Sequence, residues 1–281
     1  MMWIRRRNMK RKLFCQLCPA AYEISLWKGR TKRHIEDILS GEHFAKEKSK
    51  EVLPVIICSH KSLIRRRLGE VDMRLQENKA QNLAVAAPKV SGILIRPGET
   101  FSFWRLVGQC TEKMGYKEGL TIKNGVPSKG IGGGMCQFTN LIHWLVLHTP
   151  LEITEHHHHD GIDLFPDFGR QVPFGVGTSV MYNYLDYRFK NNSDMTYQLI
   201  VGTDEKYLTG EIRAERHIDV KYHIKSENEY FSKEGGEIFR NGQIFRECVD
   251  VRTGNLVSRE LIKVNHAKVM YDTEGLKIQN Q

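Results

Sequence analysis

The spacing of apolar residues changes twice along the chain, and these changes divide the sequence into three parts. Residues 21–87 have apolar side chains at helical intervals, such as Ile35 and Ile38, and this spacing predicts a mainly helical region. Within it, residues 52–58 are predicted to form a short buried strand. The first part, residues 1–88, is therefore expected to be a mainly helical N-terminal region.

The second part, residues 89–216, is rich in glycine and contains a single apolar helix. Residues 92–95 are predicted to form a strand that enters a Pro97-Gly98 turn. Residues 137–148 carry apolar side chains in the pattern of one buried helical stripe, which Pro150 ends. We expect a mixed domain built around this one buried helix.

Towards the C-terminus the apolar period falls from about 3.6 to about 2 residues, which predicts strands. Residues 178–190, 196–202 and 207–214 form a predicted meander, and further short strands make up a small β-rich extension, residues 217–281. Asn241-Gly242 lies between two strand-like runs and is a strong hairpin signal. The whole pattern predicts an α+β fold with a helical start, a glycine-rich mixed centre and a β-meander-rich end.

Charge adds one feature to this picture. The net charge is +9, and residues 1–85 hold 19 Lys and Arg against 9 Asp and Glu, so the excess is entirely N-terminal. Basic clusters at residues 5–7, 10–12 and 65–67 could attract an anionic membrane surface, or could simply form solvated helical faces. Nucleic acid is an unlikely partner because no nucleic-acid-binding motif accompanies the charge.

Composition and hydropathy limit the class of protein. With 40% hydrophobic and 27% charged residues, the chain resembles soluble globular proteins. No window offers the ~18 uninterrupted apolar residues of a membrane-spanning helix, and the basic N-terminus lacks the apolar core of a signal peptide. The sequence therefore predicts a cytoplasmic protein that could associate with a membrane surface.

The candidate chemistry lies in residues 130–159, where a glycine run leads into Cys136 and four consecutive histidines follow. If the helix begins near Gln137, Cys136 lies at its N-cap, where free amides and the helix dipole favour a thiolate or a bound anion. Asn140 and His143 continue the same polar stripe. His143 lies roughly 10 Å further along the helix axis, too far for a hydrogen bond to the thiol.

The histidine run allows two further kinds of chemistry. In an extended segment His157 and His159 would point one way, and His156 and His158 the other. His157 could then activate Cys136 as a nucleophile, or His157 and His159 could bind a divalent metal such as zinc. Solvated surface histidines are the third interpretation, so no cofactor is assigned.

Carboxylates offer a separate catalytic hypothesis. Glu99, in the turn before Phe101, or Glu155, beside the histidines, could act as the acid that cleaves a glycosidic bond. Glu99 is equally well explained as a residue that caps the turn. Cys136, His157, Glu99 and Glu155 are thus the candidate catalytic residues.

Several strings in this region resemble, in order and spacing, the VanW family. They are residues 97–103, 107–108, 115–116, 132–137, the histidine cluster, 168–170 and 186–191. The resemblance covers about residues 90–201. It departs from the family pattern after Gly169-Arg170, where Gln171-Val172 replaces an acidic residue and alanine.

The resemblance implies an accessory protein of glycopeptide (vancomycin) resistance that recognises or acts on peptidoglycan or its lipid-linked precursor. Three hypotheses follow: a binding protein, a peptidoglycan-modifying enzyme that uses Cys-His acyl transfer or a carboxylate, and a metal-dependent protein. The candidate ligand-binding residues are Gly132, Gly133, Gly134, Gln137, Asn140 and Arg170.

Overall fold

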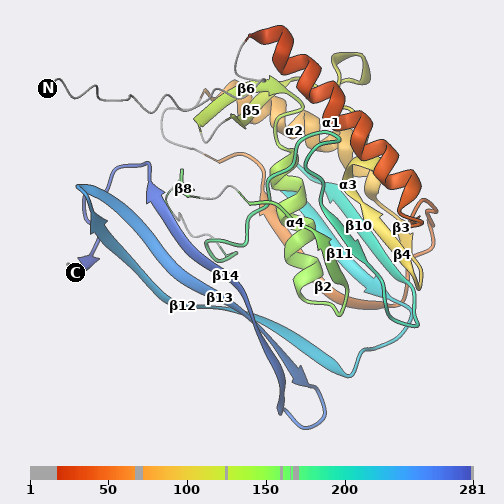
Figure 1. Ribbon diagram of the computed structural model, residues 1–281. Helices are drawn as coiled ribbons and strands as arrows, with labels where there is room; N and C mark the ends of the chain where they lie inside the picture. The colour runs from red at the N-terminus through yellow and green to blue at the C-terminus, as the bar shows by residue number, and fades with distance from the viewer. Residues whose placement is uncertain are drawn as a thin grey trace, which may run out of the picture. The chain divides into compact units, whose positions relative to one another are not determined.

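The computed structural model describes residues 18–66, 72–123, 126–158, 161–164, 166 and 171–279. The chain divides into two compact units, and the boundary follows Glu42. Helices and strands both contribute extensively (Figure 1), so the predicted α+β fold class is confirmed.

The first unit contains one long helix, α1 (Pro19–Leu39). Cys18 caps its N-terminus, where the sulfur accepts a hydrogen bond from the Ala21 N–H at 3.4 Å. Proline at the first helical position suits this start, because its fixed φ fits a helix and its missing N–H would have no partner there. At the other end, the Ser40 N–H donates to the Glu36 carbonyl.

The core of the second unit is an antiparallel four-stranded sheet covered by helices. In spatial order its strands are β2 (Val55–Leu63), β11 (Tyr207–Ala214), β10 (Tyr197–Thr203) and β3 (Ile93–Ile95). Helix α2 (Met73–Val90) packs on β10, while α4 (Met135–Leu147) packs on β11 and β2. Gly210 of β11 lets Leu141 and Leu145 of α4 approach the strand closely.

A second four-stranded sheet borders this core. Its strands, in spatial order, are β1 (His43–Phe44), β4 (Glu99–Ser102), β9 (Arg188–Lys190) and β7 (Glu152–Glu155). The short helix α3 (Phe103–Val107) follows β4 directly, and the one-turn helix η2 (Glu112–Met114) comes next. A separate hairpin of β5 (Glu118–Lys123) and β6 (Val126–Ile131) then leads into α4.

The C-terminal residues form a sheet of long strands. The spatial order is β15 (Ile278–Gln279), β12 (Val220–Glu234), β13 (Glu237–Asp250), β14 (Leu256–Val269) and β8 (Ile162–Asp163). Arg246 of β13 ties this sheet to the end of α4, because its Nε donates to the Leu147 carbonyl at 2.9 Å.

The helical, strand and turn predictions differ in their outcome. The strand at residues 92–95, the Pro97-Gly98 turn and the two strands at residues 196–202 and 207–214 are confirmed within one or two residues. The predicted strand at residues 178–190 is wrong except for its last three residues. Its backbone donors bind elsewhere: the Thr178 N–H donates to Asn140 and the Ser179 N–H to the His157 carbonyl.

Two further predictions need correction. The predicted Asn241-Gly242 hairpin is wrong, because both residues lie inside β13 and pair with β14, and Asn241 also pairs with β12. Two-sided pairing outweighs a local turn preference. The predicted meander is also interrupted, since β9 belongs to the second sheet, and of the three predicted strands only β10 and β11 pair with each other.

Candidate functional site

The glycine run before α4 is held by backbone packing and by Asn82 of α2. The Asn82 side chain is fully buried and donates to the Gly133 carbonyl at 2.9 Å. A Cβ on Gly133 would lie 2.4 Å from the backbone carbon of Gly119, and one on Gly134 would lie 2.6 Å from Cγ of Lys79. Each glycine is therefore required by a close approach, and α2 fixes where α4 begins.

Helix α4 begins earlier than the sequence pattern predicts, and its start is uncapped. The first helical residue is Met135 and the N-cap is Gly134, at φ 113°, so Cys136 is the second residue of the helix and not its N-cap. No side chain caps this end. Within the described residues, the Gly134 and Met135 N–H groups donate to no acceptor. Free amides at the positive end of a helix dipole favour an anion.

Two polar side chains of α2, Gln76 and Lys79, lie buried about one turn apart, and Lys79 is beside this helix start. Lys79 lies against Gly134 and is 7% exposed, yet it forms no hydrogen bond or ion pair with any residue that the structure describes. Gln76 is 1% exposed, and its Oε1 accepts from the Arg66 N–H at 3.3 Å. Its Nε2 has no partner in the described part of the chain.

The electrostatics of Lys79 are those of an unpaired cation. Burial, together with the positive charges of Arg66 and Arg65, lowers its pKa to about 7. Burying an ammonium without a counter-charge is costly, and buried charges in proteins are normally paired. We call Lys79 and the Gly134 and Met135 amides the α4 N-terminal site. Its three groups are all donors, so it suits an anionic oxygen-rich ligand such as a phosphate.

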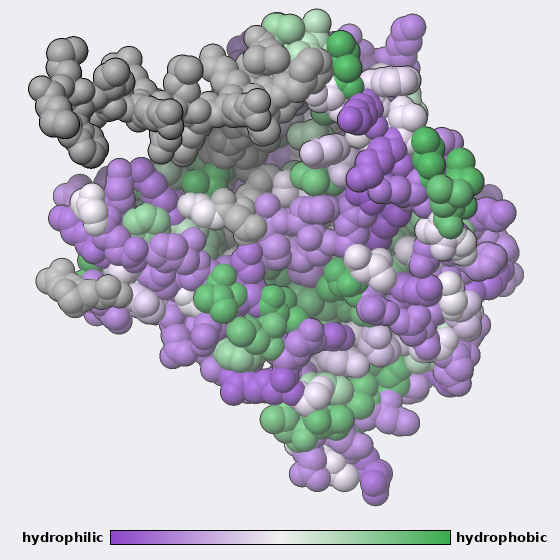
Figure 2. Space-filling view, viewed as in Figure 1, coloured by the Kyte–Doolittle hydropathy of each residue, from purple (hydrophilic) through white to green (hydrophobic). Residues whose placement is uncertain are grey.

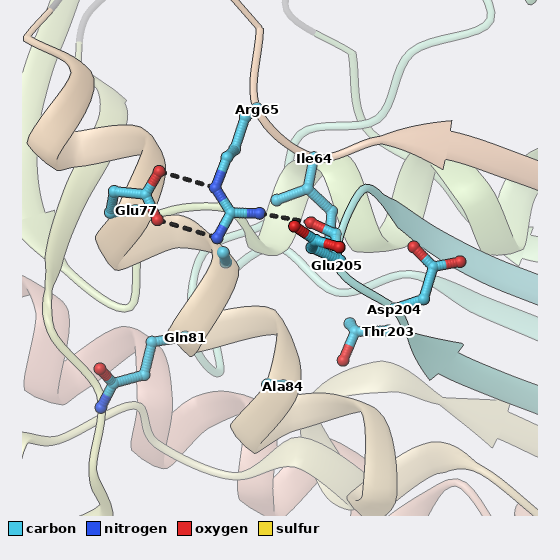
Figure 3. A pocket seen from close by; sticks show the side chains of 9 residues that line it. Ile64, Arg65, Glu77, Gln81, Ala84, Thr203, Asp204 and Glu205 are labelled. Atoms are coloured by element: carbon cyan, nitrogen blue, oxygen red, sulfur yellow. Dashed lines mark hydrogen bonds and ion pairs between the residues drawn. The ribbon is translucent and has the colours of Figure 1, made fainter.

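A shallow pocket nearby is a poorer candidate (Figure 3). It lies between the end of β2, α2 and the β10–β11 turn, and Arg65 is its central cation. Arg65 donates to both carboxylate oxygens of Glu77, at 2.7 and 2.8 Å, and to the Glu205 carbonyl at 2.6 Å. Asp204 also lines the pocket. Its cation is thus already neutralised, and the acidic lining disfavours an anion.

The structure gives Cys136 no activating partner among the described residues. Burial raises the pKa of its thiol, and hydrogen bonding from the Val180 backbone offsets this only in part. A neutral thiol is a weak nucleophile. The rest of the polar stripe is engaged in structure. Asn140 Oδ1 accepts from the Thr178 N–H at 2.6 Å, and Gln137 Nε2 donates to the Leu63 carbonyl at 2.9 Å.

The histidines alternate as an extended segment requires. The ring of His156 lies between those of His143 and His158, tilted to both, with centroids 4.1 and 4.0 Å away, while His157 points to Glu155. Burial, followed by the charge of His158, lowers the pKa of His156 to about 3. His159 and Arg170 lie outside the described residues. Among the described residues, no three His, Cys, Asp or Glu side chains converge as metal ligands.

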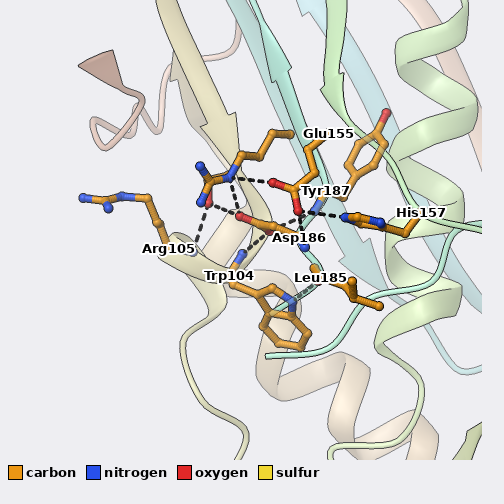
Figure 4. A network of polar contacts seen from close by, with 9 residues as sticks. Trp104, Arg105, Glu155, His157, Leu185, Asp186 and Tyr187 are labelled. Atoms are coloured by element: carbon orange, nitrogen blue, oxygen red, sulfur yellow. Dashed lines mark hydrogen bonds and ion pairs between the residues drawn. The ribbon is translucent and has the colours of Figure 1, made fainter. Parts of the chain in front are cut away.

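Glu155 is the centre of a polar network that the sequence does not reveal (Figure 4). Its Oε1 accepts from His157 Nε2 at 2.9 Å and from the Asp186 N–H at 2.8 Å. Arg188 Nε lies 2.8 Å from Asp186 and 3.5 Å from Glu155. Asp186, buried, also accepts from the Trp104 N–H at 3.0 Å. The His157 side chain is 35% exposed, so a ligand could reach this oriented imidazole.

Glu99 is placed differently from the other candidates. Its Oε2 accepts from the Arg96 N–H at 2.8 Å, across the Pro97-Gly98 turn. The structure therefore gives Glu99 the turn-capping contact that was one of its two interpretations.

Comparison with known proteins assigns this chain to a family. Residues 78–213 match the family model described as VanW like protein. The chain is 37% identical, over 209 residues, to the vancomycin B-type resistance protein VanW of Enterococcus faecalis, and the match covers 74% of this chain and 76% of that protein. The chain belongs to the VanW family. This confirms the resemblance inferred from the motifs.

A second relative is named as an uncharacterized protein. The uncharacterized protein YoaR of Bacillus subtilis is 30% identical over 118 residues, which cover 41% of this chain and 36% of that protein. No solved structure matches the chain. The part that matches the VanW family model includes Lys79, the glycine run, Cys136 and Glu155.

Lys79 and Gln76 are not among the candidate residues that the sequence predicts. Both lie in a helix with a regular apolar pattern, where a polar residue normally indicates a solvated position. Their burial depends on residues distant in sequence, such as Arg66 and Gly134, so no local signal could identify them.

Proposed function

We propose that this VanW-family protein is an accessory protein of glycopeptide resistance that recognises the lipid-linked precursor of peptidoglycan by its diphosphate. The E. faecalis relative is named as a vancomycin resistance protein, which supports the biological setting. The observation that carries the chemistry is Lys79, a buried cation without a partner among the described residues, beside an uncapped helix start.

Each group of the α4 N-terminal site has a role in this proposal. The Gly134 and Met135 amides donate to phosphate oxygens, and Lys79 supplies the charge. Gly134 is partly exposed, which leaves the site open to a ligand. Charge-assisted hydrogen bonds of this kind are roughly twice as strong as neutral ones. The ligand need not react, so this function requires neither Cys136 nor a metal.

Binding of inorganic pyrophosphate, measured by isothermal titration calorimetry, tests the proposal. We expect the wild-type protein to bind and Lys79→Met to bind at least about tenfold more weakly, which corresponds to about 1.4 kcal/mol. Lys89→Met is the matched control, because Lys89 lies three turns further along α2 and donates to the Val107 carbonyl. Equal loss in both variants, or no binding by the wild type, would refute the proposed site.

A second candidate function is peptidoglycan cleavage by the Glu155–His157 pair. The observation in its favour is the hydrogen bond that orients a partly exposed imidazole on a carboxylate, an arrangement suited to general base catalysis. Mass spectrometry of peptidoglycan incubated with the protein tests it. Product from the wild type and at least about 100-fold less from Glu155→Gln would establish this activity. No product from the wild type would exclude it.

A further inference from the structure

Helix α1 presents an apolar stripe to solvent. The stripe follows helical spacing of three and four residues, with Thr31 completing it, and all five apolar members are at least half exposed. Their exposed fractions are 55% for Ile24, 68% for Trp27, 50% for Ile35, 67% for Ile38 and 78% for Leu39. Figure 2 shows apolar surface near both ends of this helix, with polar surface between. We call these five residues the α1 stripe.

An exposed apolar stripe of this kind indicates an interaction surface. Contiguous exposed apolar surface in soluble proteins marks sites of protein or membrane interaction. None of the helices that the structure describes is both long and apolar enough to cross a bilayer. A long helix with one apolar side and charged flanks instead fits an interfacial position, in which the apolar side enters the boundary between headgroups and acyl chains. Trp27 suits that boundary, where tryptophan is enriched.

The charge beside the stripe favours an anionic surface. Residues 5–12 contain six Lys and Arg, and residues 1–17 contain no Asp or Glu. Lys28, exposed, lies one turn after Ile24 on the same side of the helix. Of the acidic residues, Glu23 is exposed one turn before Trp27, while Glu36 lies off the stripe and pairs with Lys32 at 3.4 Å. Stable membrane attachment usually needs two signals, and a basic segment next to an amphipathic helix supplies both.

We infer that α1 docks on an anionic membrane surface, with the α1 stripe in the headgroup–acyl boundary. A second copy of the chain is the alternative occupant of the stripe, and the experiment below distinguishes the two. This attachment is independent of the α4 N-terminal site.

Flotation of the full-length protein with lipid vesicles tests the inference. One set of vesicles contains equal parts phosphatidylglycerol and phosphatidylcholine, and the other contains phosphatidylcholine alone. We expect the wild type to float with the anionic set and the Trp27→Ser/Ile38→Ser variant to bind it at least about tenfold more weakly. The control is Val251→Ser/Val257→Ser, which removes valines that are 63% and 60% exposed in the second unit. We expect this control to bind like the wild type.

Three results would overturn the inference. They are no flotation of the wild type with anionic vesicles, equal flotation of the stripe variant, and equal loss in the control. Light scattering of the proteins without vesicles tests whether a second copy of the chain covers the stripe. A wild-type dimer that the stripe variant converts to a monomer would identify a self-association surface instead. Circular dichroism of each variant confirms that α1 and the sheets are retained.

Discussion

Gly133→Ala is expected to destabilise the second unit by at least about 3 kcal/mol, because the new methyl group has no space. Its Cβ would lie 2.4 Å from the carbon of Gly119 and 2.7 Å from the Leu120 carbonyl oxygen. Both neighbours are backbone atoms of β5, so no side-chain rotation relieves the overlap. The β5–β6 hairpin or the start of α4 must move, and Asn82 then loses its hydrogen bond to the Gly133 carbonyl.

Urea unfolding followed by circular dichroism measures this effect. Gly177→Ala is the control, because a Cβ there would meet only Asn140 Oδ1 at 3.9 Å and its backbone carries no positive φ. We expect the control to unfold within about 0.5 kcal/mol of the wild type. A Gly133→Ala protein as stable as this control would show that the glycine run is not packed as described.

The second large effect is the pH dependence that Lys79 imposes on stability. Its pKa is about 7 in the folded protein, against 10.5 as the ordinary value. Below pH 7 both states hold the proton, and the folded state bears the full cost of the buried charge. Between pH 7 and 10.5 only the unfolded state stays protonated, so this cost falls as pH rises. The total is at most about 5 kcal/mol, since one pKa unit is about 1.4 kcal/mol.

Lys79→Met removes this pH dependence. The variant is expected to be more stable than the wild type at about pH 6, and the difference should shrink by about 2–3 kcal/mol by about pH 9. Urea unfolding of both proteins at the two pH values gives the result, with Lys89→Met as the control for loss of a cation from α2. A difference between wild type and Lys79→Met that does not change with pH would mean that Lys79 is solvated. Bound pyrophosphate should offset part of the cost at low pH.

The sequence predicts those parts of the fold that local periodicity determines. The helical stripe of α4 and the alternation in β11 each place apolar side chains in the same core, so pattern and structure agree. In β10, by contrast, Tyr197, Gln198 and Leu199 are buried in succession. Asn241-Gly242 misleads because its side-chain and backbone partners, such as Ser232 and His266, come from neighbouring strands. Pairing across long strands cannot be read from a dipeptide.

The candidate site was predictable only in part, for the same physical reason. A glycine run before an apolar helix marks a close approach and a helix start, and both are present. The alternation of the histidines follows from extended geometry, and His156 and His157 do point apart. Lys79 and the Glu155–Asp186 network depend on contacts between distant segments. Burial and charge pairing arise from tertiary packing, which a single sequence does not display.

The most direct test of the proposed function is binding of the lipid-linked precursor itself, solubilised in detergent and titrated into the wild-type and Lys79→Met proteins. We expect wild-type binding that inorganic pyrophosphate competes away and that Lys79→Met weakens at least about tenfold. A nucleoside diphosphate sugar in a parallel titration shows whether the diphosphate alone suffices or the lipid-linked form is preferred. Precursor binding that neither pyrophosphate nor Lys79→Met affects would contradict the α4 N-terminal site, and a wild-type protein that does not bind the precursor would contradict the proposed function.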